Sequence, residues 1–269
     1  MGKKFFEDVS DRQLNKGVYW VEKNPYTGRE VKLGRMNYTF EVWCEVQKLW
    51  CGILTPAGLL TAYGDEKTLK STFLGLMMIS FLTKKQEYQN MIRCNIDPRK
   101  IGLWVDSEIP RMRLLTYQNA YMKAAGYSAP PSNYRLLQLK RFDYKMKAAM
   151  FLKYINEYRH DLGFVAVDGF VDLLAGMNEE QQAKELMAEF DYYRETYQFS
   201  SVSLIHKNRN NKRTSGSAGS VLDKKSDYLA ELNRADKKAN AIITTSRNGT
   251  PEYFEKLEIN FVNDLPSFM

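Results

Sequence analysis

Three residues with the spacing of a phosphate-binding loop stand at positions 64, 70 and 71. Gly64, Lys70 and Ser71 fall in register with the pattern G-x-x-x-x-G-K-[ST], in which Leu69 replaces the second glycine. Such a loop surrounds phosphate with backbone N–H groups, brings a lysine ammonium to the outer phosphates and gives a hydroxyl to Mg²⁺. We expect Lys70 to face solvent, and we expect the nucleotide contacts to be Gly64, Lys67, Thr68, Lys70, Ser71 and Thr72.

Two apolar runs downstream end in carboxylates. Residues 164–167 lead into Asp168, the form of a Walker B segment, whose aspartate holds Mg²⁺ directly or through water. Residues 101–105 lead into Asp106 and Glu108, and Glu108 is placed to polarise an attacking water. Because ligands of open α/β sheets bind at the carboxyl ends of strands, we expect these groups to meet the phosphate loop.

Two further apolar runs end in cationic or titratable side chains. His206 follows residues 201–205 and is expected to sense the γ-phosphate; the alternative is a histidine that only caps a strand end. Arg247 follows residues 241–245 and is expected to project from the sheet edge that carries the phosphate site or from its neighbour. The alternative for Arg247 is a salt-bridged surface arginine.

The segment 207–220 has the composition of a loop. It contains four basic residues, no acidic residue and a Gly/Ser tract. One interpretation is a solvated connection between two strands. The functional interpretation is a basic loop that contacts nucleic-acid phosphates through Lys207, Arg209, Lys212 and Arg213.

These residues need a scaffold of strands alternating with helices. Short runs rich in β-branched and aromatic residues predict strands at 59–63, 101–105, 164–167, 201–205, 228–232 and 241–245. Helical periodicity predicts helices at 70–84, 111–125, 144–160 and 178–197. Buried strands separated by helices indicate an α/β domain with a mostly parallel central sheet flanked by helices. The alternation in residues 256–262 adds an antiparallel edge at the C-terminal end.

The composition excludes several classes of protein. With 269 residues, 44% of them hydrophobic and 26% charged, the chain can build a core without a disulfide or metal. Two histidines and three cysteines without a CxxC pair leave little for a zinc site or a Ser-His-Asp hydrolase. The three cysteines also agree with a reducing cytoplasm, where we expect the protein.

Charge and hydropathy bear on partners and domains. The net charge of +7 favours a polyanionic partner. The longest apolar run, residues 73–82, covers about half a bilayer span, so no membrane crossing is expected. Residues 1–50 are predicted to form an N-terminal strap or small hairpin, and residues 51–269 one domain.

Taken in order, the motifs resemble those of the RecA-like P-loop ATPases, and among these the RepA-type hexameric helicases of plasmids, phages and mobile elements. The resemblance spans about residues 55–262, and the matching positions are Lys70-Ser71, Asp106-Ser107-Glu108, Asp168-Gly169-Phe170, His206, the segment 214–220 and the segment 246–249. The chain departs from the family pattern at three places. Leu69 replaces a glycine, His206 followed by Lys207 replaces the family's paired histidine, and Thr245 stands where the family often has a lysine.

The resemblance implies a Mg²⁺-dependent ATPase that acts on single-stranded DNA as a homo-oligomeric ring. The nucleotide would lie between subunits, and Arg247 would reach the γ-phosphate of the neighbouring subunit. The implied catalytic residues are Lys70, Glu108, Asp168, His206 and Arg247, with Ser71 and Asp168 as the Mg²⁺ ligands.

Two alternatives stay open at this point. One is a catalytically weak or inactive structural or regulatory subunit of the same fold, which Leu69 favours. The other is a small-molecule P-loop kinase, which the absence of an Arg-rich lid in the sequence disfavours.

Overall fold

The computed structural model describes residues 19–23, 30–35, 38–44, 49–65, 70–83, 86–207, 216–235, 238–246, 257–262 and 265–268. The chain divides into two units, Met1–Tyr38 and Thr39–Met269. In the first unit, β1 (Tyr19–Lys23) and β2 (Glu30–Arg35) form an antiparallel pair. All elements described below belong to the second unit, with which residues 39–50 also cluster.

A nine-stranded sheet with the order β15-β14-β13-β12-β5-β11-β10-β8-β9 forms the centre of the second unit. Its parallel strands are β5 (Leu59–Gly64), β8 (Ile101–Asp106), β9 (Tyr134–Gln138), β10 (Leu162–Asp168), β11 (Ser200–His206) and β12 (Tyr228–Ala235). The antiparallel strands are β13 (Lys238–Ser246), β14 (Leu257–Val262) and β15 (Leu265–Phe268). The predicted mostly parallel sheet with an antiparallel C-terminal edge is confirmed; β9 and β15 were not predicted.

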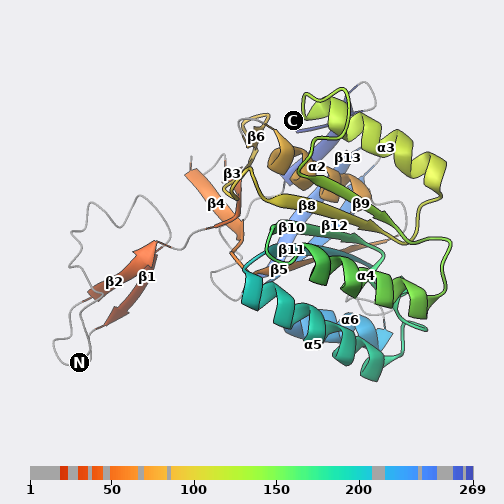
Figure 1. Cartoon of the computed structure of the whole chain (residues 1–269). Helices are drawn as coiled ribbons and strands as arrows, with labels where there is room; N and C mark the ends of the chain where they lie inside the picture. Colours follow the sequence, from red (N-terminus) through yellow and green to blue (C-terminus); the bar gives the residue numbers. More distant parts are fainter. Residues whose placement is uncertain are drawn as a thin grey trace. The chain divides into compact units, whose positions relative to one another are not determined.

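Helices cover both faces of this sheet (Figure 1). One face carries α2 (Lys70–Leu82) and α3 (Arg111–Ala124), and the other carries α4 (Tyr144–Tyr158), α5 (Glu180–Tyr197) and α6 (Gly216–Lys225). The chain first runs from β5 outward to β8 and β9 at one edge of the sheet, and then returns through β10 and β11 to β12. Because crossovers between parallel strands are right-handed, the helices of the outward path and those of the return path lie on opposite faces. The chain therefore continues from the adjacent strands β5 and β11 toward opposite faces of the sheet, the position at which open α/β sheets bind ligands.

The helix α2 is apolar on all sides because it lies between two sheets. The second sheet is antiparallel and has the order β4-β3-β7-β6, formed by β3 (Phe40–Cys44), β4 (Leu49–Leu54), β6 (Glu87–Tyr88) and β7 (Ile92–Cys94). Every residue of α2 except Ser71 is buried, and Ser80 donates a hydrogen bond to the Ile92 carbonyl on β7 (3.3 Å). This packing fixes the N-terminal end of α2 beside the end of β5.

The helix α6 corrects the loop prediction for residues 216–220. Ala218, Val221 and Leu222 are buried in the core cluster that also contains Phe190 of α5. The Gly/Ser composition that suggested a loop instead allows this short helix to pack closely. Residues 208–215 lie outside the described part of the chain. Among the described residues, no helix combines the length and apolar character that a bilayer span requires.

Candidate functional site

The Lys70 ammonium lies at the carboxyl ends of β5 and β11. Its Nζ donates to the carbonyl oxygens of Gly64 (3.1 Å) and Asp65 (2.7 Å) and lies 3.4 Å from Nδ1 of His206. The lysine is 9% exposed, so the expectation of a solvent-facing side chain is wrong. Because Lys70 is the first residue of a helix packed against the sheet, its stem is covered while its charge reaches the strand end.

His206 connects Lys70 to Glu108. Its Nε2 lies 3.5 Å from Oε1 of Glu108, on the side of the ring opposite Lys70. An ammonium can only donate, so in the neutral ring Nδ1 accepts from Lys70 and Nε2 carries the proton toward Glu108. The hydrogen bond with His206 lowers the pKa of Glu108 against the effect of burial, and the charges of Lys70 and Lys140 lower it further. Glu108 is therefore a carboxylate at neutral pH.

Two buried aspartates lie side by side next to this group. Asp168 at the end of β10 is paired in register with Asp106 at the end of β8, and both side chains are at most 2% exposed. Burial, followed by the charge of Asp106, raises the pKa of Asp168 to about 8, although a hydrogen bond with Ser71 opposes this. Burial also raises the pKa of Asp106 to about 6, opposed by hydrogen bonds from the N–H groups of Ile109 and Glu108.

These aspartates have the chemistry expected of ligands for a divalent cation. Oδ2 of Asp106 and Oδ2 of Asp168 are buried and accept no hydrogen bond from any described residue. Asp168 also hydrogen-bonds the Ser71 hydroxyl, and carboxylate and hydroxyl oxygens are the ligands that Mg²⁺ prefers. The residues present therefore fit the cation that the sequence pattern implied.

Glycine at position 169 is required for the strand ends to meet. Gly169 has a φ of 84°, and a Cβ there would lie 2.3 Å from Oγ of Ser107 and 2.7 Å from Cγ of Glu108. The Ser107 hydroxyl donates across the gap to the Gly169 carbonyl (2.8 Å). Ser107 and Gly169 therefore fix the position of Glu108 relative to Asp168, a role that the sequence analysis did not assign.

The remaining predicted site residues are separate from this cluster or outside the described chain. Thr72 is buried in α2, where its hydroxyl hydrogen-bonds Tyr121. The Lys207 ammonium pairs with the Glu231 carboxylate, which raises the pKa of Lys207. The predicted residues outside the described chain are Lys67, Thr68, Arg209, Lys212, Arg213 and Arg247.

The strand that precedes Arg247 ends away from this site. Ser246, its last residue, pairs with Tyr228, and Tyr228 pairs with Leu60 at the amino end of β5. Gly64, at the carboxyl end of β5, pairs with Leu232 instead. Because β13 runs antiparallel to its neighbours, it delivers the chain to the sheet edge opposite Lys70.

The metal-free protein should lose stability as the pH rises, and Asp168→Asn should reduce that loss. The pKa of Asp168 is raised from about 4 when unfolded to about 8 when folded, so between these values the folded state holds a proton that the unfolded state releases. Stability therefore falls by at most about 1.4 kcal/mol per pH unit. An asparagine avoids this loss, so its stability advantage over wild type should widen from pH 5 to pH 8.

Thermal unfolding in EDTA, followed by circular dichroism, measures this difference. The matched control is Asp161→Asn, which replaces an exposed carboxylate just before the other end of β10. Parallel pH profiles for wild type and Asp168→Asn would show that Asp168 ionises normally in the folded protein.

Taken together, the first turn of α2 and the carboxyl ends of β11, β10 and β8 bring an ammonium, a hydroxyl, two buried aspartates and a Glu–His pair to one edge of the sheet. This set can bind a phosphate-bearing ligand together with a divalent cation and can activate a water molecule. Comparison of the chain with protein-family models and with curated proteins finds no match.

Proposed function

We propose that the protein is a RecA-like, Mg²⁺-dependent ATPase that acts on single-stranded DNA. The observation that carries the proposal is the convergence of five predicted site residues from separate segments of the chain: Lys70, Ser71, Glu108, Asp168 and His206. These residues are up to 136 positions apart in sequence. The sequence predicts each of them as a phosphate-binding, Mg²⁺-binding or water-activating residue, so their meeting at one sheet edge supports a shared role.

In this proposal, Lys70 and the N-terminus of α2 bind the outer phosphates of ATP. The ammonium exchanges the Gly64 and Asp65 carbonyls for phosphate oxygens, which carry charge and are stronger acceptors. The first N–H groups of α2 add partial positive charge. Ser71 and Asp168 would hold Mg²⁺, which when bound neutralises charge on the phosphate oxygens.

Glu108 is the proposed general base. Its lowered pKa keeps it ionised, and Asp106 orients its backbone through the two N–H groups of the 108–109 turn. His206 lies between Glu108 and Lys70, so a change in the position of the ammonium on phosphate binding would pass directly to the base. We assign His206 the role of γ-phosphate sensor on this geometry.

The oligomeric part of the proposal concerns Arg247. The strand β13 ends with Ser246 at the sheet edge opposite Lys70. In the proposal, Arg247 therefore reaches the γ-phosphate of a neighbouring subunit, as in a homo-oligomeric ring. The proposed DNA contacts of the 207–213 segment are Arg209, Lys212 and Arg213, with Lys207 available only on release from Glu231.

A second candidate is a non-hydrolysing subunit of the same fold. Its support is the engagement of Lys70 by two carbonyl oxygens, together with Leu69 at the position of a glycine. If these contacts persist, the ammonium is not available to phosphate.

Steady-state ATP hydrolysis separates the two candidates. We expect Mg²⁺-dependent phosphate release by wild-type protein that increases several-fold when oligo(dT) is added. Addition of EDTA should abolish it, because Asp168 and Ser71 then lack the cation. Absence of phosphate release with oligo(dT) at millimolar Mg-ATP would favour the non-hydrolysing subunit.

A further inference from the structure

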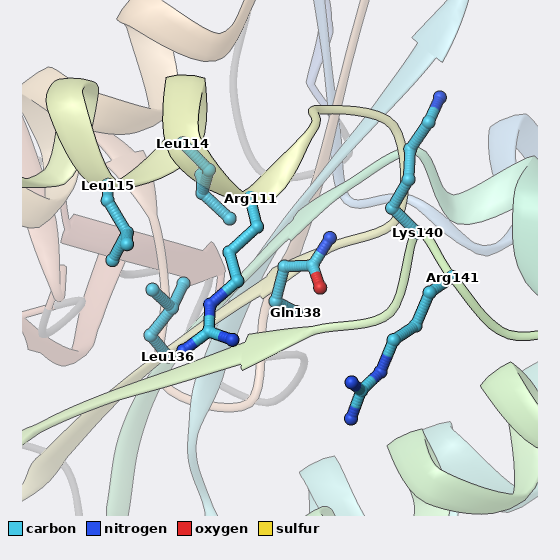
Figure 2. Close-up of a pocket in the computed structure, with 7 residues that line it drawn as sticks. All are labelled: Arg111, Leu114, Leu115, Leu136, Gln138, Lys140 and Arg141. Atoms are coloured by element: carbon cyan, nitrogen blue, oxygen red, sulfur yellow. The ribbon is translucent and has the colours of Figure 1, made fainter.

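A cationic pocket lies between the first turn of α3 and the end of β9. It has a volume of about 430 Å³ and is lined by three basic side chains, Arg111, Lys140 and Arg141. Its apolar wall consists of Leu114, Leu115 and Leu136, and Gln138 adds an amide. Figure 2 shows Arg111 reaching from α3 toward β9, while Lys140 and Arg141 extend to opposite sides of the segment that follows β9. None of the described residues that line the pocket is acidic.

The pocket lies within the segment that carries the whole charge excess of the chain. The sequence has 39 basic and 32 acidic residues, and positions 109–147 hold eight basic residues and one acidic residue. The rest of the chain, including the predicted basic loop, is therefore balanced at 31 of each. The net charge of +7 is thus located around α3, β9 and the start of α4.

Local geometry adapts this pocket to phosphate. The guanidinium of Arg141 lies 4.8 Å from the centre of the Phe142 ring, within the range of a cation–π contact. The α3 helix begins after Pro110 with no side-chain cap and no acidic residue in its first turn. Its first N–H groups thus add partial positive charge on the side of Arg111.

We infer that this pocket binds the backbone of single-stranded nucleic acid, with one base against the leucine wall. The inference rests on the proposed function, because it gives a binding surface to the nucleic-acid partner named there. An apolar wall beside three cations matches a nucleotide unit, which joins a flat apolar base to charged phosphates. Two further basic residues of this part of the chain, Arg113 in the first turn of α3 and Lys145 at the start of α4, are exposed.

The pocket is electrostatically coupled to the ATPase site. The charge of Lys140 acts on Glu108 and helps to keep that carboxylate ionised. A phosphodiester bound at Lys140 would partly neutralise this charge. Binding of a strand in the pocket would therefore weaken one of the charges that lower the pKa of Glu108.

The test is binding of fluorescein-labelled oligo(dT), measured by anisotropy across a series of NaCl concentrations without nucleotide. The pocket variant combines Arg111→Gln, Lys140→Gln and Arg141→Gln, which remove charge but keep long side chains. The control variant combines Lys123→Gln, Lys153→Gln and Lys184→Gln, three exposed lysines on α3, α4 and α5. Both variants lose the same charge, and circular dichroism verifies that each is folded.

We expect the pocket variant to bind at least about tenfold more weakly and to reduce the log–log salt slope by about 2, roughly 0.7 for each lost phosphate contact. The control should change affinity by less than about twofold. Equal losses in the two variants, or an unchanged pocket variant, would overturn the inference. Competition by polyglutamate or by dTMP as strong as that by unlabelled oligo(dT) would also overturn it.

These outcomes are separable from those of the proposed function. If wild-type protein hydrolyses ATP but the pocket variant binds oligo(dT) normally, the proposed ATPase stands and the proposed role of the pocket is wrong. If wild-type protein shows no ATP hydrolysis but the pocket variant loses oligo(dT) binding, the proposed role of the pocket stands and the proposed ATPase is wrong.

Discussion

Glu108→Gln protein should bind Mg-ATP with wild-type affinity and hydrolyse it about 10²–10⁴-fold more slowly. Glutamine preserves the size of the side chain and can still accept a hydrogen bond from Nε2 of His206, which lies 3.5 Å from Oε1. It cannot accept a proton from water. The expected loss is therefore confined to turnover, while the phosphate contacts of Lys70 and Ser71 remain.

Single-turnover hydrolysis gives the rate of the chemical step, and equilibrium nucleotide binding on the same preparation gives the affinity for Mg-ATP. The control is Glu157→Gln, the same substitution at an exposed position of α4. Wild-type turnover in Glu108→Gln protein would show that Glu108 is not the general base and only holds His206 in place. A parallel loss of nucleotide affinity would assign it a structural role at the carboxyl edge of the sheet.

The carboxyl edge of the parallel sheet was predictable because its residues follow buried runs directly. Asp106, Asp168 and His206 are each the last residue of a strand, and every strand of this type ends at the same edge. Chain order and strand period therefore sufficed to bring them together. The same reasoning does not extend to β13, which is antiparallel, because a run of apolar residues does not reveal strand direction.

Other features depend on contacts that no local pattern records. The small antiparallel sheet pairs residues 40–42 with 92–94, so neither partner indicates the other. The strand β9 alternates poorly, since Arg135 and Leu136 are both partly buried. The helix α6 is composed of small residues that favour loops, and only its packing against α5 explains it. The burial of Lys70 likewise follows from its contacts with the end of β5 and with His206 of β11.

Equilibrium binding of Mg-ATP by wild type and by Lys70 variants tests the central claim most directly. Because the Lys70 stem is buried, Lys70→Met is the principal variant, since it keeps the length and packing of the side chain and removes only the ammonium. Lys70→Ala is the second variant, and Lys153→Ala is the control for loss of an exposed charge. Circular dichroism and thermal unfolding establish that each variant is folded.

Isothermal titration calorimetry should show saturable binding to wild type that EDTA abolishes. Loss of two charge-assisted hydrogen bonds to phosphate, each about 1.5–3 kcal/mol, should weaken binding by Lys70→Met about 10²–10⁴-fold. The Lys153→Ala control should bind as wild type does. Wild-type affinity in folded Lys70→Met protein, or no saturable binding by wild type at millimolar Mg-ATP, would contradict a nucleotide site at the carboxyl edge of β5.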